Sequence, residues 1–219
     1  MENQFNQERN KFVNDRISQK YNELYESSEE IIFDAGKPTE FVDQISNFVK
    51  NGKVLDIGGG DGRNALYLAE RGYDVEVVDL AQAGLDKLKK FADERGLQIK
   101  TKAGDIMQEK INGTYEVLVS SFMMQHLSRF EAETLIKEMK DHTAPGGVNV
   151  LAVFTKEGDF YNSDPTTKCF YPVLGELKEM YSDWEVKDYK EIEDTANQKN
   201  KDGTHTRNIN AFLIAQKLF

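Results

Sequence analysis

A glycine-rich stretch over residues 54–63 constrains this chain more than any other feature. It reads Val54-Leu55-Asp56-Ile57-Gly58-Gly59-Gly60-Asp61-Gly62-Arg63, an apolar run followed by closely spaced glycines. Small and apolar residues then recur at helical spacing through Ala69, which predicts a buried strand that turns sharply into a helix. Glycine has no Cβ, so the backbone can turn tightly and approach a ligand closely. The stretch therefore predicts a nucleotide-type binding loop.

The spacing of these glycines favours one class of loop. The dinucleotide fingerprint G-x-G-x-x-G/A requires a small residue three positions after its second glycine, and this chain has Arg63 there. The third spaced glycine is instead Gly62, which gives D-x-G-x-G-x-G from Asp56 onward. This acidic pattern resembles motif I of class I S-adenosylmethionine-dependent methyltransferases. Their cofactor has no pyrophosphate, but its amino-acid end and ribose suit an acidic loop. A plain strand-to-helix connection is the alternative.

Length and composition predict one globular domain. The chain has 219 residues, of which 39% are hydrophobic and 30% charged. No apolar run approaches the roughly 18 residues that span a bilayer, and Met1 to Asn10 lack the apolar core of a signal peptide. We therefore expect a cytoplasmic protein with a single methyltransferase domain over residues 1–219. Its expected parts are N-terminal helices with a possible lid (1–50), a cofactor-binding core (51–154), and a substrate-side loop with a C-terminal hairpin (155–219).

Charge and cysteine content exclude several classes of ligand. The formal net charge is −10, whereas nucleic acids are bound through clustered Lys and Arg. The single cysteine, Cys169, leaves no internal disulfide and no multi-cysteine metal site. We expect no nucleic-acid partner, no membrane and no metal, and a monomer or homodimer that acts on a small molecule.

Apolar periodicity predicts strands that alternate with helices. Such an order predicts a parallel sheet with helices on both faces, and the last two strands predict an antiparallel hairpin. Helices are expected over residues 3–26, 39–49 with Thr39 as cap, 82–95 and 174–181, after the glycine loop, and after the capping box of Ser128 and Glu131. Strands are expected over residues 54–57, 73–79, 98–102, 115–120, 148–154, 184–192 and 209–217. Between them we expect a turn at Pro145-Gly146-Gly147, a substrate-side loop over 155–172, and a polar connection over 194–207 with a turn at Asp202-Gly203.

The first helix has two interpretations. Val13, Ile17, Tyr21 and Tyr25 recur at helical spacing among charged residues, which predicts an amphipathic helix. The two tyrosines either pack on the body of the protein or form a lid over the cofactor, as in many small-molecule methyltransferases.

Two aspartates follow the second and third strands. Asp79 lies 19 residues beyond Gly60, the distance at which a βαβ unit brings a carboxylate to the ribose. Capping of the next helix is the alternative role. Asp105, in Ala103-Gly104-Asp105-Ile106, resembles the third methyltransferase motif, in which an acidic side chain takes the adenine amino group and Ile106 would lie against the ring. The cofactor-binding residues that we expect are Asp56, Gly58, Gly59, Gly60, Gly62, Arg63, Asp79, Leu80, Asp105, Ile106 and Ser121.

The segment after the fourth strand is expected to border the transfer site. It runs from Ser121 to Leu127, and ligands of open α/β sheets bind outside the carboxyl ends of the strands. His126 is a candidate base or substrate contact, or a histidine hydrogen-bonded within its own loop. Cys169 is expected to be a packed thiol, because methyl transfer needs no covalent enzyme intermediate.

A closer resemblance covers residues 50–217. The stretches Val54 to Leu68 and Gly72 to Val75 are similar to the tellurite-resistance methyltransferase family. The similarity continues in Ser120-Ser121 with Leu127, in Pro145-Gly146-Gly147, in Gly175 to Lys178, and in Tyr181 with Asp183-Trp184-Glu185. It implies a Rossmann-like class I methyltransferase fold, with a seven-stranded, mostly parallel sheet and an antiparallel last strand.

The chain departs from this family where the acceptor is chosen. The family usually has cysteine where this chain has Gly59. Before the last strand the family carries a His-Arg or His-Lys pair followed by an arginine, which is implicated in the transfer site. The place of that pair falls near Asn197-Gln198 here, while His205 and Arg207 lie further on. The candidate catalytic residues are therefore His126, His205 and Arg207.

These inferences predict methyl transfer from S-adenosylmethionine to a small acceptor. The resemblance implies a chalcogen oxyanion such as tellurite or selenite, or a thiol, although amines and carboxylates stay open. Gly58 to Gly62 would hold the amino-acid end, with Arg63 as a partner of its carboxylate. One rival is a nicotinamide-dependent oxidoreductase, and a second is a non-catalytic regulatory module with a methyltransferase fold.

Overall fold

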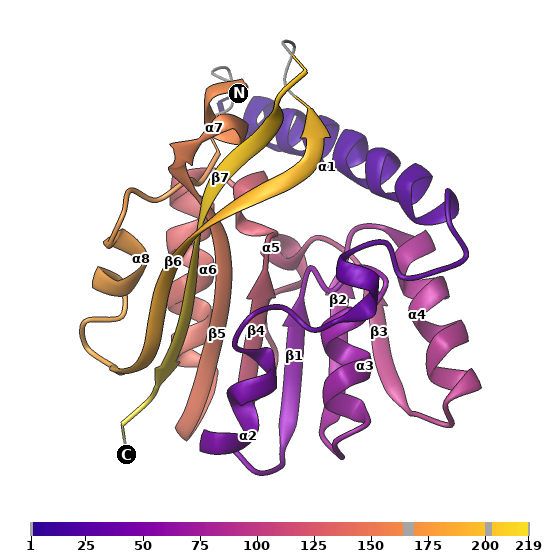
Figure 1. Ribbon diagram of the computed structural model, residues 1–219, viewed down its shortest axis with the longest axis vertical. Helices are drawn as coiled ribbons and strands as arrows, with labels where there is room; N and C mark the ends of the chain where they lie inside the picture. Colours follow the sequence, from indigo (N-terminus) through magenta and orange to yellow (C-terminus); the bar gives the residue numbers. More distant parts are fainter. Residues whose placement is uncertain (1, 164–168, 200–202, 219) are drawn as a thin grey trace. The chain divides into compact units, whose positions relative to one another are not determined.

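The computed structural model describes residues 2–163, 169–199 and 203–218, and over these it contains a seven-stranded sheet with helices around it (Figure 1). The strands are β1 (Lys53–Ile57), β2 (Asp74–Asp79), β3 (Ile99–Ala103), β4 (Tyr115–Ser121), β5 (Thr143–Gly158), β6 (Glu185–Lys199) and β7 (His205–Gln216). Their order is β3-β2-β1-β4-β5-β7-β6. β2 pairs with β3 and β4 pairs with β5 in parallel, and β7 runs antiparallel to both of its neighbours. The expected fold class is confirmed.

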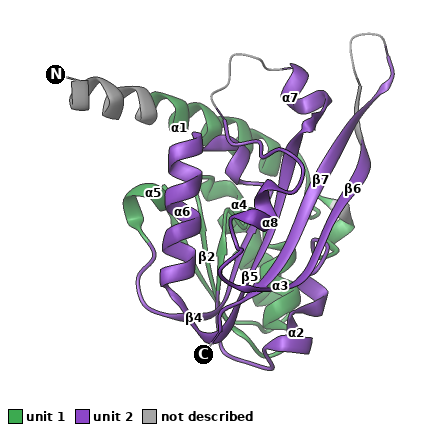
Figure 2. Ribbon diagram, turned by 90° about the vertical axis from the view of Figure 1, so that its left-hand side faces the viewer, with its two compact units in different colours: residues 1–38, 55–110 green, residues 39–54, 111–219 purple. Residues whose placement is uncertain are grey.

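The chain divides into two compact units (Figure 2), and each is described by itself. The first contains residues 1–38 and 55–110. Its strands β2 and β3 pair in parallel from Val75 with Ile99 to Asp79 with Ala103. Apolar side chains of β2 and of the following helix form its buried core. Its helices are α1 (Glu2–Glu26), the 3-10 turn η1 (Asp34–Gly36), α3 (Arg63–Ala69), α4 (Gln82–Glu94) and α5 (Ile106–Glu109).

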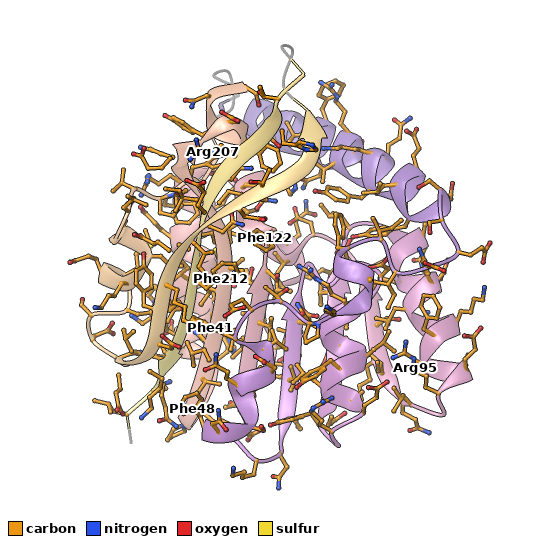
Figure 3. The ribbon with its side chains drawn as sticks, in the orientation of Figure 1. Phe41, Phe48, Arg95, Phe122, Arg207 and Phe212 are labelled. Atoms are coloured by element: carbon orange, nitrogen blue, oxygen red, sulfur yellow. The ribbon has the colours of Figure 1, made fainter. Side chains whose placement is uncertain are left out.

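The second unit contains residues 39–54 and 111–219. Val148 to Ala152 of β5 are buried between β4 and β7, as expected of a strand paired on both sides. Phe41, Phe122 and Phe212 pack edge to face, with ring centroids 6.1 and 5.9 Å apart (Figure 3). Its helices are η2 (Val42–Gln44), α2 (Ile45–Phe48), η3 (Met124–His126), α6 (Arg129–Asp141), α7 (Asp159–Ser163) and α8 (Glu176–Glu179).

Several local predictions are confirmed. The first helix ends at Glu26, and α4 begins at Gln82, as expected. Ser128 and Glu131 form both bonds of the capping box that begins α6. The inward positions of α6 are buried as predicted: Ala132, Leu135, Ile136 and Met139. Within the described part of the chain, no helix is long and apolar enough to cross a bilayer.

The helix expected from Thr39 to Val49 was wrong. Phe41 has a left-handed backbone with φ of 75°, so regular helix cannot begin before it. A 3-10 turn and one α-helical turn follow instead. Thr39 does not cap this helix, since its hydroxyl bonds to the Ser121 hydroxyl at 2.7 Å. Phe41, Val42 and Ile45 are nevertheless buried, as their apolar spacing predicts. Their packing in the core therefore overrides the helix that the spacing predicted.

Three connections also differ from expectation. Residues 145–147 lie within β5 as a bulge, because Tyr115 pairs with Thr143 but Val117 pairs with Val148. The loop expected over 155–172 is occupied by the end of β5 and by α7, and its residues 164–168 lie outside the described residues. The polar connection expected over 194–207 is largely hairpin, since Asp194 pairs with Asn208 and Thr195 with Arg207. The expected turn at Asp202-Gly203 falls partly outside the described residues.

The expectation of one domain over residues 1–219 stays a prediction.

Candidate functional site

The glycine loop lies at the carboxyl end of β1 and turns as its sequence predicts. Gly58, Gly60 and Gly62 have φ of 72°, 54° and 91°, a region that L side chains rarely adopt. The Gly58 amide donates to the Val78 carbonyl at 2.7 Å, which attaches the loop to β2. Gly62 is the N-cap residue of α3, and its carbonyl accepts the first helical bond from Leu66. The loop thus presents backbone without side chains at the end of the sheet where ligands bind.

Replacing Gly62 by alanine is expected to lower the free energy of unfolding by about 3 kcal/mol, from backbone strain and overpacking together. A Cβ on Gly62 would overlap the side chain of Leu88, which is fully buried. Gly72→Ala is the matched control, because Gly72 has φ of 85° but open space around it. Urea unfolding should show a loss of only about 1 kcal/mol for the control. Equal losses in the two variants would contradict the steric role of Leu88.

Asp56 is the most unusual side chain of this loop region. It is fully buried, and neither carboxyl oxygen has a hydrogen-bond partner among residues 2–163, 169–199 and 203–218. Burial, reinforced by the negative charge of Asp79, raises the pKa of Asp56 to about 7, and Arg63 opposes this rise. A Cβ on Gly59 would lie 2.9 Å from Asp56 Oδ2, so the carboxyl lies directly against the loop. Such a group favours a cationic ligand nearby, because an opposite charge stabilises the ionised form.

Asp79 ends β2 and connects the loop with α4. Its Oδ2 accepts the Gly60 amide and its Oδ1 the Ala81 amide, each at 2.8 Å. Burial raises the pKa of Asp79, while these backbone donors lower it. Each carboxylate oxygen has two acceptor positions, so one on each oxygen is used by these bonds. The carboxylate orders the loop and can still accept ribose hydroxyls, whereas the N-cap residue of α4 is Ala81 and not Asp79.

Asp105 follows β3 and caps the short helix α5. Its Oδ1 accepts the Met107 amide at 2.9 Å, which explains why the chain turns here. Ile106, the residue expected against the adenine ring, is 6% exposed. The helix α1 also contacts this carboxylate, because Asn14 donates to Oδ2 at 2.7 Å. Asn14 was not predicted, because only the apolar positions of α1 form a periodic pattern in the sequence.

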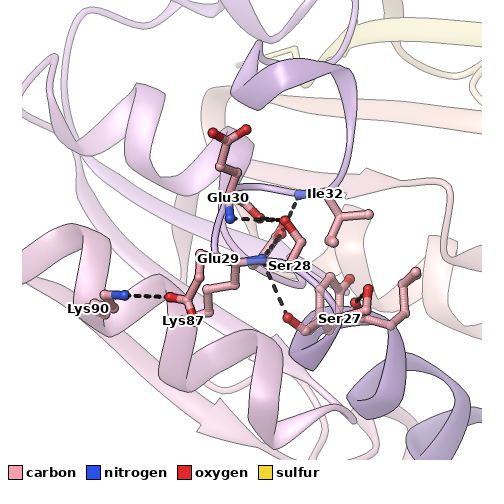
Figure 4. Close-up of polar contacts among 10 residues, drawn as sticks. Ser27, Ser28, Glu29, Glu30, Ile32, Lys87 and Lys90 are labelled. Atoms are coloured by element: carbon pink, nitrogen blue, oxygen red, sulfur yellow. Dashed lines mark hydrogen bonds and ion pairs between the residues drawn. The ribbon is translucent and has the colours of Figure 1, made fainter.

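The segment after α1 attaches the N-terminal region to the glycine loop. The Ile32 amide donates to Asp61 Oδ2 at 2.8 Å, and Lys87 of α4 lies 3.6 Å from the same oxygen. Both side chains of this ion pair are buried, unlike the exposed pair of Lys90 with Glu29 (Figure 4). Tyr25 packs against Gly60, where an added Cβ would overlap the tyrosine hydroxyl. Burial and the charges of Asp79 and Asp61 raise the pKa of Tyr25, so the phenol stays neutral.

In the second unit, Ser121 and Phe122 lie at the carboxyl end of β4. Phe122 has φ of 51°, an uncommon conformation for a bulky residue and one that is found mostly at functional sites. Its ring lies 4.7 Å from that of Phe154, which lies 4.9 Å from that of Phe160. The sequence analysis did not assign a role to Phe122, and strain of this kind has no sequence signal.

The candidate catalytic residues occupy different positions in this unit. His126 ends the turn η3, is half-buried, and lies 3.4 Å from the Gln125 amide nitrogen. His205 and Arg207 are exposed at the start of β7, and Arg207 forms an ion pair with Glu193. Successive side chains of a strand point to opposite faces, so the residues buried at this end of β7 are instead Thr206, Asn208 and Asn210. Asn210 Oδ1 has no hydrogen-bond partner within the described residues.

The structure therefore gathers the expected cofactor residues of the first unit at the carboxyl ends of β1, β2 and β3. The buried Asp56 carboxyl has no hydrogen-bond partner among the described residues, and together with the glycine loop it suits an ammonium group. Asp79 suits the hydroxyls of a nucleoside, and Asp105 suits its amine. These features are those of the class I S-adenosylmethionine-dependent methyltransferase fold.

Comparison with known proteins identifies the family. A family model described as tellurite resistance protein TehB matches residues 18–212, and the chain belongs to this family. A probable S-adenosyl-L-methionine-dependent methyltransferase TehB from Haemophilus influenzae is 33% identical over 165 residues, 75% of this chain and 57% of that protein. The crystal structure of TehB from Haemophilus influenzae has 31% identity and a TM-score of 0.71, covering 80% of this chain and 61% of that one. The chain thus spans less than two thirds of these relatives.

More distant matches belong to the same fold class. A sarcosine/dimethylglycine N-methyltransferase from Aphanothece halophytica is 29% identical over 159 residues, 69% of this chain and 53% of that enzyme. A methyltransferase structure from Methanosarcina mazei has 20% identity and a TM-score of 0.63, covering 80% of this chain and 97% of that one. The latter supports the fold alone.

Proposed function

We propose that this protein transfers the methyl group of S-adenosylmethionine to a small acceptor. The single observation that carries the proposal is the convergence of the glycine loop, Asp79 and Asp105 at adjacent strand ends in the first unit. The names of its relatives support the same donor. A dinucleotide enzyme is disfavoured, because Arg63 begins α3 where its fingerprint needs a small residue.

The cofactor supplies an activated methyl group on a sulfonium, so the residues of this chain bind, orient and exclude water. We assign Gly58, Gly60, Gly62 and Arg63 to the amino-acid end of the cofactor, with Gly59 and Asp56 against them. Orientation of two reactants can contribute about 7–11 kcal/mol to a rate enhancement. The remaining assignments are Asp79 and Leu80 to the ribose, Asp105 and Ile106 to the adenine, and Ser121 to the border of the site.

The acceptor that we propose is a chalcogen oxyanion such as tellurite or selenite, or a thiol. The family description supports a chalcogen substrate, and these nucleophiles are already anionic or easily ionised, so they need little base catalysis. We propose that His126, which is half-buried, and the exposed His205 and Arg207 of the hairpin orient the acceptor or take its proton. We further propose that the protein works in the cytoplasm as a monomer or homodimer.

The test is calorimetry with S-adenosylhomocysteine, followed by a screen for its release from S-adenosylmethionine. Tellurite, selenite, thiols, amines and carboxylates are compared as acceptors. We expect micromolar binding, and turnover with a chalcogen oxyanion or a thiol. Absence of binding would remove the proposal, and binding without turnover across all acceptors would favour a regulatory module. Turnover only with amines or carboxylates would overturn the proposed acceptor class.

A further inference from the structure

One polar stripe of α1 contacts the elements assigned to the nucleoside. Asn14, Ser18 and Asn22 are four residues apart and therefore lie along one side of the helix over about 12 Å. Asn14 donates to Asp105 after β3, and Ser18 donates to the Leu80 carbonyl after β2 at 2.9 Å. Asn22 accepts the Ala83 amide in the first turn of α4 at 2.8 Å. Helix α1 passes over the ends of β2 and β3 and the start of α4 (Figure 1).

These contacts form a connected network. The Asn22 amide also donates to the Ser18 hydroxyl at 3.3 Å, so that hydroxyl accepts one bond and donates another. Ala81, the N-cap residue of α4, makes no side-chain cap. Asn22 supplies the missing acceptor from a helix 61 residues away in sequence. The N-terminal helix is thus bound specifically in this position.

Asn14 donates to one of the two carboxylate oxygens of Asp105, the residue assigned to the adenine amine. Asp105 Oδ2 accepts Asn14 at 2.7 Å and Gln108 at 3.2 Å, which fills both acceptor positions of that oxygen. The donor of Asn14 is an NH₂ group on a planar carbon, as is the 6-amino group of adenine. Asn14 therefore offers Asp105 the same hydrogen-bond chemistry as the nucleobase.

The packing of α1 permits its release. Phe12 and Val13 are 63% and 41% exposed, so these two apolar side chains of α1 bury only part of their surface. An open depression of about 630 Å³ lies between the end of α1 and α4, with Asn22, Tyr25, Ala83 and Lys87 in its lining. Tyr25 is the buried apolar anchor on this helix. The hydrogen bonds of Asn14, Ser18 and Asn22 therefore contribute to holding α1 in place.

We propose that Asn14 competes with the adenine amino group for Asp105, so that α1 must release this carboxylate when the nucleoside binds. This inference rests on the proposed function, because it requires that the protein binds an adenine nucleoside. It assigns to Asn14 a role in setting nucleoside affinity and adenine selectivity. Asn14 is a positioning residue and takes no part in methyl transfer.

The experiment is calorimetry on the full chain with three probes: S-adenosylhomocysteine, adenosine, and purine riboside, which lacks the 6-amino group. Asn14→Ala and Asn14→Leu remove the competing donor and favour helix. We expect S-adenosylhomocysteine to bind about tenfold more tightly to both variants than to the wild type. The preference for adenosine over purine riboside should rise by a similar factor. Gln19→Ala is the matched control, because Gln19 donates within the helix to exposed Glu23, and it should change neither value.

The possible outcomes separate the two proposals. Equal affinities in the wild type and the Asn14 variants would overturn the inference and leave the proposed function standing. Weaker binding by the variants would also overturn it, since Asn14 would then help to hold the nucleoside. The variants could also bind S-adenosylhomocysteine more tightly while their preference for adenosine over purine riboside stays unchanged. Asn14 would then not compete with the 6-amino group, and the inference would be overturned. No binding of S-adenosylhomocysteine to wild type would instead remove the proposed function.

Discussion

Asp56→Asn is expected to gain stability relative to the wild type as the pH rises from 4 to 8. The folded state raises the pKa of this carboxyl from its ordinary 3.8 to about 7. The folded protein therefore holds a proton that the unfolded chain releases between these values, and the wild type loses stability as pH rises through this window. This difference in pKa between the folded and unfolded states corresponds to a loss of about 4 kcal/mol in the free energy of unfolding across the window. Urea unfolding at a series of pH values, without cofactor, measures it as the difference between the two proteins.

Asp43→Asn provides the control for this experiment. Asp43 is an exposed carboxylate of η2, so its removal should leave the shape of the pH profile unchanged. Other carboxyls, such as Asp183 beside Lys140, have a lowered pKa and act in the opposite direction in both proteins. Taking the difference from the wild type cancels them. If the free energy of unfolding changed with pH in the same way in the wild type and Asp56→Asn, the prediction that the buried carboxyl is neutral below pH 7 would be contradicted.

Asp79→Asn is expected to weaken S-adenosylhomocysteine binding about a hundredfold. Two ribose hydroxyls that donate to a carboxylate contribute about 1.5 kcal/mol each, and an amide offers one acceptor oxygen instead of two. The amide nitrogen would also face a backbone donor, either Gly60 or Ala81. Calorimetry measures the affinity, and thermal unfolding shows whether the loop stays folded.

The matched control is Asp74→Asn, at the exposed beginning of the same strand, where Asp74 pairs with Lys100. It should bind S-adenosylhomocysteine as the wild type does. A second comparison uses dideoxyadenosine, which lacks both ribose hydroxyls. Its affinity should differ little between the wild type and Asp79→Asn. An equal loss for adenosine and dideoxyadenosine would show that Asp79 acts through the loop and not through the ribose.

The cofactor side of the site was predictable because its signals are local. Positive φ at Gly58, Gly60 and Gly62 is written into the residue type, and the spacing to Asp79 follows from the length of one strand-helix-strand unit. Asp105 was predicted from a resemblance to the third methyltransferase motif, and it caps the short helix α5 that follows β3. These roles stay proposals, but their positions at neighbouring strand ends follow from the parallel order of the sheet.

The acceptor side was less predictable, because it depends on which face of the hairpin each residue occupies. Residues 194–199 and 205–207 look like parts of a polar loop in the sequence, yet their cross-strand pairs make them extensions of β6 and β7. A strand fixes alternation, and so Arg207 is exposed while Asn208 is buried. Whether a polar segment forms strand depends on its partner, which a local pattern does not contain.

The sequence by itself determined the succession of the seven strands along the chain, the turn of the glycine loop and the family to which the chain belongs. Apolar periodicity and glycine conformation act within a few residues, so a pattern can specify them. Only the tertiary structure showed that Asp56 is buried with no hydrogen-bond partner among the described residues and that Phe122 has a strained backbone. It alone showed the hydrogen bond from Asn14 to Asp105, two residues 91 positions apart in the sequence. Burial and long-range hydrogen bonds depend on what the fold brings together, and no local pattern encodes that.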